Sequence, residues 1–265
     1  MFALAVFANT AYGITGSFTP DRTPYVGVVV SFSDDAKPLG YSTGFLLSPT
    51  VMLTAGHSLL GAAKVSVCFD KGPIDFGIAD DGTIVYNGTD TIWNGVPQLY
   101  PNYIFKLTGN QEFSTSDIGL VLLDQPVVGV TVFPELPTNH FVDTLPAKTD
   151  LQLIGYGFQY QTTPRNGGVM NAWTGTLSCN KGHAQLISAN FAASNKYLRL
   201  TANPSQDKGG VAFGDSGGPV IYNDGNSEIV LGINAYITNS NCRGVSYHTR
   251  IDESQILNWI TSKLS

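Results

Sequence analysis

The sequence predicts an all-β fold, and three observations support that prediction. Short apolar runs of strand length recur every 8 to 15 residues, with Gly, Pro, Asn or Asp between them. The 29 Gly and 14 Pro among 265 residues suit a chain with many tight turns. Charged residues make up only 13% of the chain, and long surface helices would need more Lys and Glu.

The predicted strands show no internal repeat of about 20 to 50 residues, which argues against a propeller or a solenoid. In chain order they are Tyr25–Phe32, Gly44–Leu47, Lys64–Phe69, Thr83–Tyr86, Ile118–Leu123, Leu151–Tyr156, Gly175–Ser178, Tyr197–Thr201, Pro219–Tyr222, Ile229–Ile237 and Val245–Ile251.

Two segments depart from the strand pattern. Val132–Asp150 carries three prolines near the middle of the chain and is the predicted linker. After Ile251, Asp252 can cap a helix, and Gln255 follows three residues later. We expect a short terminal helix that docks on the second half of the chain through a single apolar face, which comprises Ile256, Leu257, Ile260 and Leu264.

Composition excludes several classes of function. The apolar content of 43% is that of a packed protein rather than a disordered one. A net charge of −6 gives no electrostatic basis for binding nucleic acid. The longest apolar run, Met1–Ala8, is far shorter than the roughly 20 residues that span a bilayer, so no membrane partner is expected.

The N-terminal segment resembles the end of a secretion signal. Its apolar run is followed by Ala11-Tyr12-Gly13, with small residues at the two positions that a signal peptidase reads, although no positive residue precedes it. We interpret residues 1–13 as the remnant of a signal, which predicts a secreted, extracellular protein. The alternative is a disordered apolar tail.

The segment Gly214–Pro219, with the sequence Gly-Asp-Ser-Gly-Gly-Pro, is the strongest motif. Glycines on both sides of Ser216 allow backbone N–H groups to point toward its hydroxyl, as acyl transfer requires. A serine also needs a base, and His57 follows an apolar run. Asp117 lies at a polar-to-apolar border, where its carboxylate can be buried against the imidazole.

The order His57, Asp117, Ser216, together with Tyr247-His248-Thr249-Arg250, resembles the chymotrypsin-like (trypsin-like) serine peptidases, in particular the secreted bacterial-type branch. The resemblance implies two antiparallel six-stranded β-barrels with a short C-terminal helix. It divides the chain into the leader over 1–13, a first barrel over 14–134, a linker over 135–150, and a second barrel with the helix over 151–265.

The resemblance also implies a mechanism. Ser216 attacks a peptide carbonyl, and His57 acts as general base and then as general acid. Asp117 holds the His57 imidazole in the required tautomer. The N–H groups of Gly214 and Ser216 form the oxyanion hole, and no cofactor is needed. We propose no metal ligands, because His140, His183 and His248 lack a metal-binding spacing.

The resemblance also implies a substrate specificity, through two positions that correspond to the family's substrate-binding pocket and substrate-binding strand. Gly210 stands at the base of the pocket for the residue before the scissile bond, where an Asp would select Lys or Arg. Ala235, Tyr236 and Ile237 form the strand that pairs with substrate, and the branched Ile237 narrows the pocket entrance. We therefore expect a preference for small or apolar residues, such as Ala, Val or Leu.

The cysteines depart from the family pattern. Ser58 and Ser42 stand where relatives carry a disulfide pair, and Ala212 stands where many have the partner of a cysteine placed like Cys242. A pair between Cys179 and Cys242 remains a candidate, and Cys68 is expected to be a buried free thiol.

Activation in the family places a new N-terminal ammonium beside the aspartate that precedes the nucleophile. Ile14-Thr15-Gly16-Ser17 resembles the start of mature relatives, which implies that Ile14 and Asp215 form this pair after cleavage behind Gly13. The alternative is that residues 1–13 persist and that Arg22 or backbone donors satisfy Asp215.

The expected partners are a polypeptide substrate and a candidate protein inhibitor, and we expect a monomer. Two other functions stay open at this point. One is a catalytically impaired protein that uses the protease fold for binding, and the other is an esterase that uses the same triad.

Overall fold

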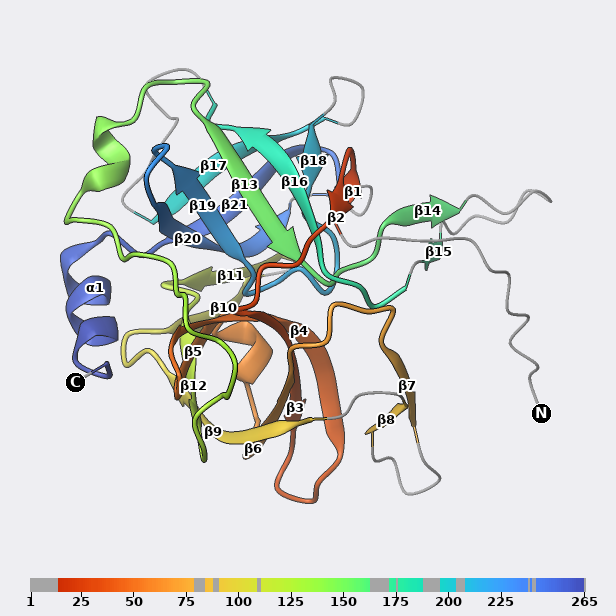
Figure 1. Ribbon diagram of the computed structural model, residues 1–265. Coiled ribbons are helices and arrows are strands. Elements are labelled where there is room, and N and C mark those ends of the chain that lie inside the picture. The colour runs from red at the N-terminus through yellow and green to blue at the C-terminus, as the bar shows by residue number, and fades with distance from the viewer. Residues whose placement is uncertain are drawn as a thin grey trace.

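The computed structural model describes residues 14–78, 84–87, 91–108, 111–162, 172–174, 176–187, 196–203, 208–237, 239 and 242–264. The leader remnant predicted over residues 1–13 lies outside the described residues. Two β units, one formed mostly by the first half of the chain and one by the second, lie against each other in Figure 1.

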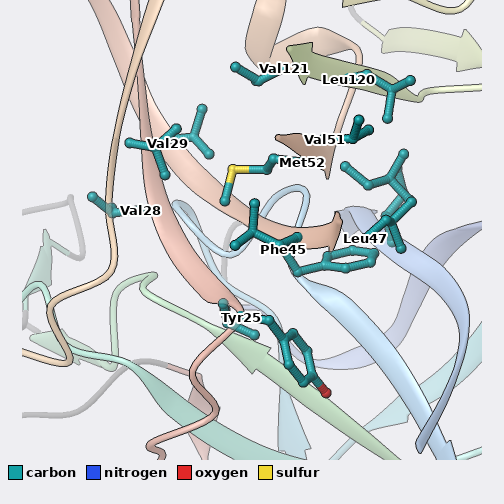
Figure 2. Packing of buried hydrophobic residues seen from close by; sticks show 14 of the residues in the cluster. Tyr25, Val28, Val29, Phe45, Leu47, Val51, Met52, Leu120 and Val121 are labelled. Carbon is teal, nitrogen blue, oxygen red and sulfur yellow. The ribbon is translucent and has the colours of Figure 1, made fainter. Parts of the chain in front are cut away.

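The first unit is a closed barrel with the strand order β12-β5-β4-β3-β6-β9. Its interior is filled by branched aliphatic side chains together with Phe45 and Met52, which converge in Figure 2. Close packing of this kind excludes water and makes the barrel a rigid platform for the loops at its ends. The strands are β3 (Val26–Phe32), β4 (Pro38–Ser48), β5 (Val51–Thr54), β6 (Lys64–Cys68), β9 (Trp93–Leu99) and β12 (Gly119–Leu123).

The second unit is a sheet with the order β17-β21-β20-β19-β13-β16-β2. An isolated bridge between Leu186 and Leu200 joins the end of β16 to β17. The six strands of this sheet other than β2 therefore also close into a ring. They are β13 (Asp150–Gly155), β16 (Asn180–Gln185), β17 (Tyr197–Ala202), β19 (Pro219–Asn223), β20 (Glu228–Ile237) and β21 (Gly244–Arg250).

The start of the described chain belongs to this second unit. Strand β2 (Thr19–Pro20) extends its sheet beside β16, and β1 (Thr15–Gly16) pairs with β18 (Gly209–Gly210). Figure 1 shows both N-terminal strands, in red, against the second sheet. Strands β1 and β2 precede the first barrel in sequence, but their pairing holds them close to the loops of the second unit.

Short elements complete the fold. Three hairpins pair β7 (Asp75–Ile78) with β8 (Ile84–Asn87), β10 (Ile104–Thr108) with β11 (Gln111–Thr115), and β14 (Tyr160–Thr162) with β15 (Ala172–Thr174). The helical elements are η1 (His57–Leu59), η2 (Phe141–Thr144) and α1 (Ser254–Thr261). No helix in the described part of the chain is long and apolar enough to span a bilayer.

The predicted all-β class and the terminal helix are confirmed, with three local corrections. The strand expected over Gly175–Ser178 is wrong for residues 176–178, the part that the structure describes: Leu177 forms only an isolated bridge with Ile74. Cys179 donates its N–H to Lys71 O, so this segment pairs with a loop of the first unit rather than with a sheet.

The other two corrections concern α1. Asp252 does not cap it, because its carboxylate binds the buried guanidinium of Arg250 and the Val142 N–H. The helix also docks on both units rather than on the second alone. The Trp259 ring meets Tyr100 of the first unit edge-on, with centroids 5.2 Å apart.

Candidate active site

His57 and Asp117 meet at one end of the first barrel. His57 opens η1 just after β5, and Asp117 precedes β12, which pairs with β5. The imidazole Nδ1 lies 2.7 Å from Asp117 Oδ2, and the His57 N–H donates to Oδ1 at 2.7 Å. Because the carboxylate accepts, the Nδ1 atom carries the proton and Nε2 keeps its lone pair.

Burial differs between the two partners in a way that suits catalysis. The Asp117 side chain is 2% exposed, whereas the His57 side chain is 34% exposed and can be reached by a substrate. A buried carboxylate with both oxygens bound to one histidine holds the ring in a single orientation.

The loop that carries Ser216 comes from the second unit and packs closely on the strand that leads to His57. A Cβ at Gly217 would lie 2.1 Å from Thr54 Oγ1 and 2.7 Å from the Ala55 backbone nitrogen. Gly217 also has a φ of +84°, so only glycine allows this approach. The structure therefore brings the predicted nucleophile to the strand end that holds the predicted base.

Backbone hydrogen bonds orient the nucleophile loop. The Asp215 N–H donates to Ala212 O, and the Gly217 N–H donates to Asn234 O. Within the described residues, the N–H groups of Gly214 and Ser216 donate to no protein acceptor. Two backbone donors without acceptors beside a serine hydroxyl are what a site for an anionic oxygen requires.

Asp215 is fully buried beneath this loop. Its carboxylate accepts the Gly157 N–H and the Ala212 N–H, each at 2.8 Å, and the backbone N–H of Ile14. Burial raises the pKa of Asp215 to about 7, because these neutral donors offset only part of the desolvation of the charge. In the uncut chain the donors to the Asp215 carboxylate are therefore backbone N–H groups.

Ile14 is completely buried, with a φ of +65°. That conformation is strained for a β-branched residue, because its Cβ crowds the neighbouring peptide groups.

The predicted specificity residues lie on β18 and β20. Gly210 is buried, and a Cβ there would lie 3.0 Å from the Ala202 Cβ. Strand β20 pairs with β21 as far as Ile237, but its pairing with β19 ends at Ile233. In the described structure, the β19-side edge of β20 from Ala235 to Ile237 is therefore not covered by a sheet partner.

The predicted Tyr236 packs against two aromatic side chains that the sequence analysis did not select, Tyr247 of β21 and Tyr197 of β17. The rings of Tyr236 and Tyr247 stack with centroids 4.7 Å apart, and Tyr197 meets Tyr236 edge-on at 5.4 Å. Burial first, and then the charge of Asp117, raise the pKa of Tyr197 to about 12. The three rings come from separate strands, so sequence spacing gave no signal that they meet.

A buried polar chain lies behind the nucleophile loop and was also missed. The amide of Asn234 donates to Asp215 O at 3.1 Å, which leaves Oδ1 to accept from His248 Nδ1 at 2.9 Å. Ser246 Oγ lies 2.8 Å from His248 Nε2. Burial lowers the pKa of His248 to about 3, so its imidazole is neutral and supports the loop structurally.

All three cysteines are free and buried, so the candidate pair of Cys179 with Cys242 is not formed. The Cys179 thiol lies 3.8 Å from Asp21 Oδ2. The negative charge of Asp215 contributes to raising the pKa of the Cys242 thiol. Burial is the main cause that raises the pKa of both thiols to about 12, which keeps them protonated. The described residues contain no group of three or more His, Cys, Asp or Glu that could hold a metal.

Comparisons with known proteins identify the family and the fold. The trypsin family model matches residues 17–260. No curated protein matches the chain. A solved structure described as an HL collagenase has a TM-score of 0.65 and 16% identity, and the match covers 95% of this chain and 97% of that one. At that identity the likeness shows the fold alone, whereas the family match spans most of the 265 residues. This chain therefore belongs to the trypsin family and is a serine endopeptidase.

Proposed function

We propose that the enzyme cleaves polypeptides through a triad of Ser216, His57 and Asp117. Ser216 Oγ gives its proton to His57 Nε2 and bonds to the scissile carbonyl carbon. His57 then passes that proton to the leaving amine as the C–N bond breaks. Water then takes the place of the amine, and the same steps run in reverse: His57 takes a proton from water, water attacks the acyl carbon, and the proton returns to Ser216 as the ester bond breaks. The N–H groups of Gly214 and Ser216 stabilise the oxyanion, each by roughly 3 kcal/mol.

One observation carries this proposal. Both Asp117 oxygens bind His57, at 2.7 Å each, which leaves Nε2 as the basic atom of the ring. A purely structural histidine would be expected to be buried, as His248 is, whereas the His57 side chain is 34% exposed.

Labelling with a serine-directed phosphonyl fluoride tests the proposal. We expect one label per chain, no label in Ser216→Ala, and unchanged labelling in Ser42→Ala, which removes another buried serine hydroxyl. Absence of labelling in the folded wild type would favour a binding protein. Labelling together with ester hydrolysis but without peptide cleavage would favour the esterase.

We propose that the enzyme prefers small or apolar residues before the scissile bond. Gly210 brings no charge to the pocket base, and its surroundings are the Ala202 side chain and the Cys242 carbonyl. The half-buried Ile237 lies on the open edge of β20, where it narrows the entrance. A peptide library should show faster cleavage after Ala, Val or Leu than after Arg or Lys, and the reverse order would contradict the proposal.

Activation is proposed to follow cleavage between Gly13 and Ile14. A new α-ammonium at Ile14 would place a cation beside Asp215, where an amide N–H now stands. It would also remove the strained φ of +65°, because an N-terminal residue has no preceding carbonyl. N-terminal sequencing of the active secreted enzyme should give Ile14 as the first residue. Full activity with Met1 retained would exclude the pair as a requirement.

Secretion, a monomeric state and the division of the chain into four segments are part of the same proposal, except that β1 and β2, which that division places in the first barrel, pair with strands of the second unit. All proposed catalytic groups come from one chain, so a second copy is not required. Culture fractionation and sedimentation should place the active enzyme outside the cell as a single chain. A protein inhibitor that binds at the proposed active site would compete with phosphonylation of Ser216.

A further inference from the structure

The hydroxyl of Thr43 connects the first barrel to the nucleophile loop of the second unit. Thr43 lies in β4 and is completely buried. Its Oγ1 donates to Gly214 O at 2.9 Å and accepts the Tyr156 N–H at 3.0 Å. Its own N–H donates to Ser216 O at 2.9 Å. One residue therefore holds the carbonyls on both sides of Asp215.

Thr43 is itself held in place. It pairs with Val28 of β3, and its carbonyl accepts the hydroxyl of Thr54 at 2.7 Å. The barrel core around β3 and β4 is closely packed, so the Thr43 side chain is an anchored donor rather than a mobile one.

The nucleophile loop needs such an anchor because Gly214 has little conformational preference of its own. Its φ is +97°, and glycine rotates more freely than any other residue. Each peptide plane is rigid, so the direction of the Gly214 carbonyl sets the orientation of the Gly214–Asp215 peptide, which links the two peptides that carry the Gly214 and Ser216 N–H groups. With all three cysteines free, no disulfide constrains this rotation.

We propose that Thr43 is a positioning residue that holds the Gly214 and Ser216 N–H groups in their oxyanion-binding orientation. The inference rests on the proposed function, because it assigns those two N–H groups to the oxyanion. Thr43 does not touch the substrate. It acts through the Gly214 carbonyl, and loss of its hydroxyl would also leave the Tyr156 N–H without its partner.

The test compares three variants of Thr43 in the full-length enzyme. Thr43→Val keeps the shape but removes the hydroxyl, Thr43→Ala removes the hydroxyl and the methyl, and Thr43→Ser keeps the hydroxyl. Ser42→Ala is the matched control, because the neighbouring Ser42 hydroxyl is buried and has no hydrogen-bond partner among the described residues. Activity is expressed per site titrated with the phosphonyl fluoride, so that a misfolded fraction does not count.

We expect Thr43→Val and Thr43→Ala to lose kcat by about 10- to 100-fold, the size expected for a modest misplacement of catalytic groups, with little change in KM. Affinity for a peptide boronate should fall by a similar factor, because its tetrahedral adduct places an oxygen in the hole. Thr43→Ser and Ser42→Ala should stay within about threefold of the wild type. A purely structural role would lower the melting temperature and the titrated fraction, but not kcat per titrated site.

The outcomes separate this inference from the proposed function. If the wild type is neither labelled nor active, the proposed function fails. If the wild type is active and Thr43→Val keeps its kcat and boronate affinity, only the role of Thr43 is overturned. If Thr43→Val does not fold, the Ser and Ala variants decide, and equal kcat values for those two would overturn the inference.

Discussion

The buried carboxylate of Asp215 accepts a hydrogen bond from the backbone N–H of Ile14, so the start of the described chain and the nucleophile loop contact each other directly. The contact places a neutral donor where a charge would stabilise Asp215 far more. The pKa of Asp215 is raised, and Ile14 has a positive φ. Both features show that the uncut chain is locally destabilised where Ile14 meets Asp215.

The first prediction concerns the stability of the uncut chain. Its Asp215 has a pKa of about 7 when folded, against an ordinary value of 3.8, so the folded state binds the proton more tightly. The contribution of Asp215 to stability is therefore present at low pH and is lost as pH rises from about 4 to about 7. Urea unfolding should show this decline relative to Asp215→Asn, whose amide does not titrate.

The matched measurement uses enzyme that begins at Ile14. There the ammonium favours ionised Asp215, so the decline relative to Asp215→Asn should disappear or reverse. The same slope in both forms would show that the new N-terminus does not reach Asp215.

The second prediction is that the triad acts as a unit. Ser216→Ala and His57→Ala should each lower kcat by about 10⁴- to 10⁶-fold, and the double variant should be little worse than either. The physical reason is that the proton of Ser216 has no acceptor without His57, and His57 has no proton to transfer without Ser216. Losses that multiply in the double variant would contradict a shared step.

Much of this architecture could be predicted from the sequence, because local patterns specify it. The apolar runs around Val29 and Val121 became barrel strands, and the motifs at His57 and Ser216 depend on short-range glycine and strand geometry. Contacts between distant segments could not be predicted in this way. The hydroxyl of Thr43 meets Gly214 only because two β units pack together.

Errors at α1 and at Gly175–Ser178 have the same origin. Asp252 has the residue type of a helix cap, but the buried Arg250 guanidinium is a stronger partner for its carboxylate than a helix N–H. Leu177 has the pattern of a strand, but its neighbour in space is the loop at Ile74. In both places a tertiary partner outweighed the local preference.

The third prediction concerns His248. Its pKa is about 3 in the folded protein, below the ordinary 6.5, because the buried ring cannot be charged without losing solvation. The stability that it contributes is therefore present above about 6.5 and is lost as pH falls toward 3, opposite in sign to Asp215. The difference in unfolding free energy between wild type and His248→Gln should shrink as pH falls. A difference independent of pH would mean that folding does not lower the pKa of His248.

The fourth prediction concerns specificity. Ile237→Gly should widen the pocket entrance and increase cleavage after large apolar residues, such as Phe and Leu, by about 10-fold relative to cleavage after Ala. Peptide-library profiling measures this ratio directly. Val128→Gly, at a side chain that is 84% exposed, is the control for a general effect of an added glycine. An unchanged ratio would remove Ile237 from the pocket.

The last prediction concerns the ion pair that fixes the linker and the terminal helix. The Arg250 side chain is 1% exposed, and its Nε and Nη2 each bind an oxygen of the fully buried Asp252 at 2.8 Å. Asp252 Oδ2 also accepts the Val142 N–H of η2, so one carboxylate joins β21 to the segment between the two units.

Removing one member of this pair leaves the other charge buried without its partner. Arg250→Met should therefore lower the free energy of unfolding by about 3–5 kcal/mol. Arg250→Lys should recover only part of that loss, because an ammonium cannot bind both carboxylate oxygens as a planar guanidinium does. The exposed Arg243→Met is the control and should change stability by less than about 0.5 kcal/mol. Equal losses for Arg250→Met and Arg243→Met in urea unfolding would show that the buried pair does not hold the linker in place.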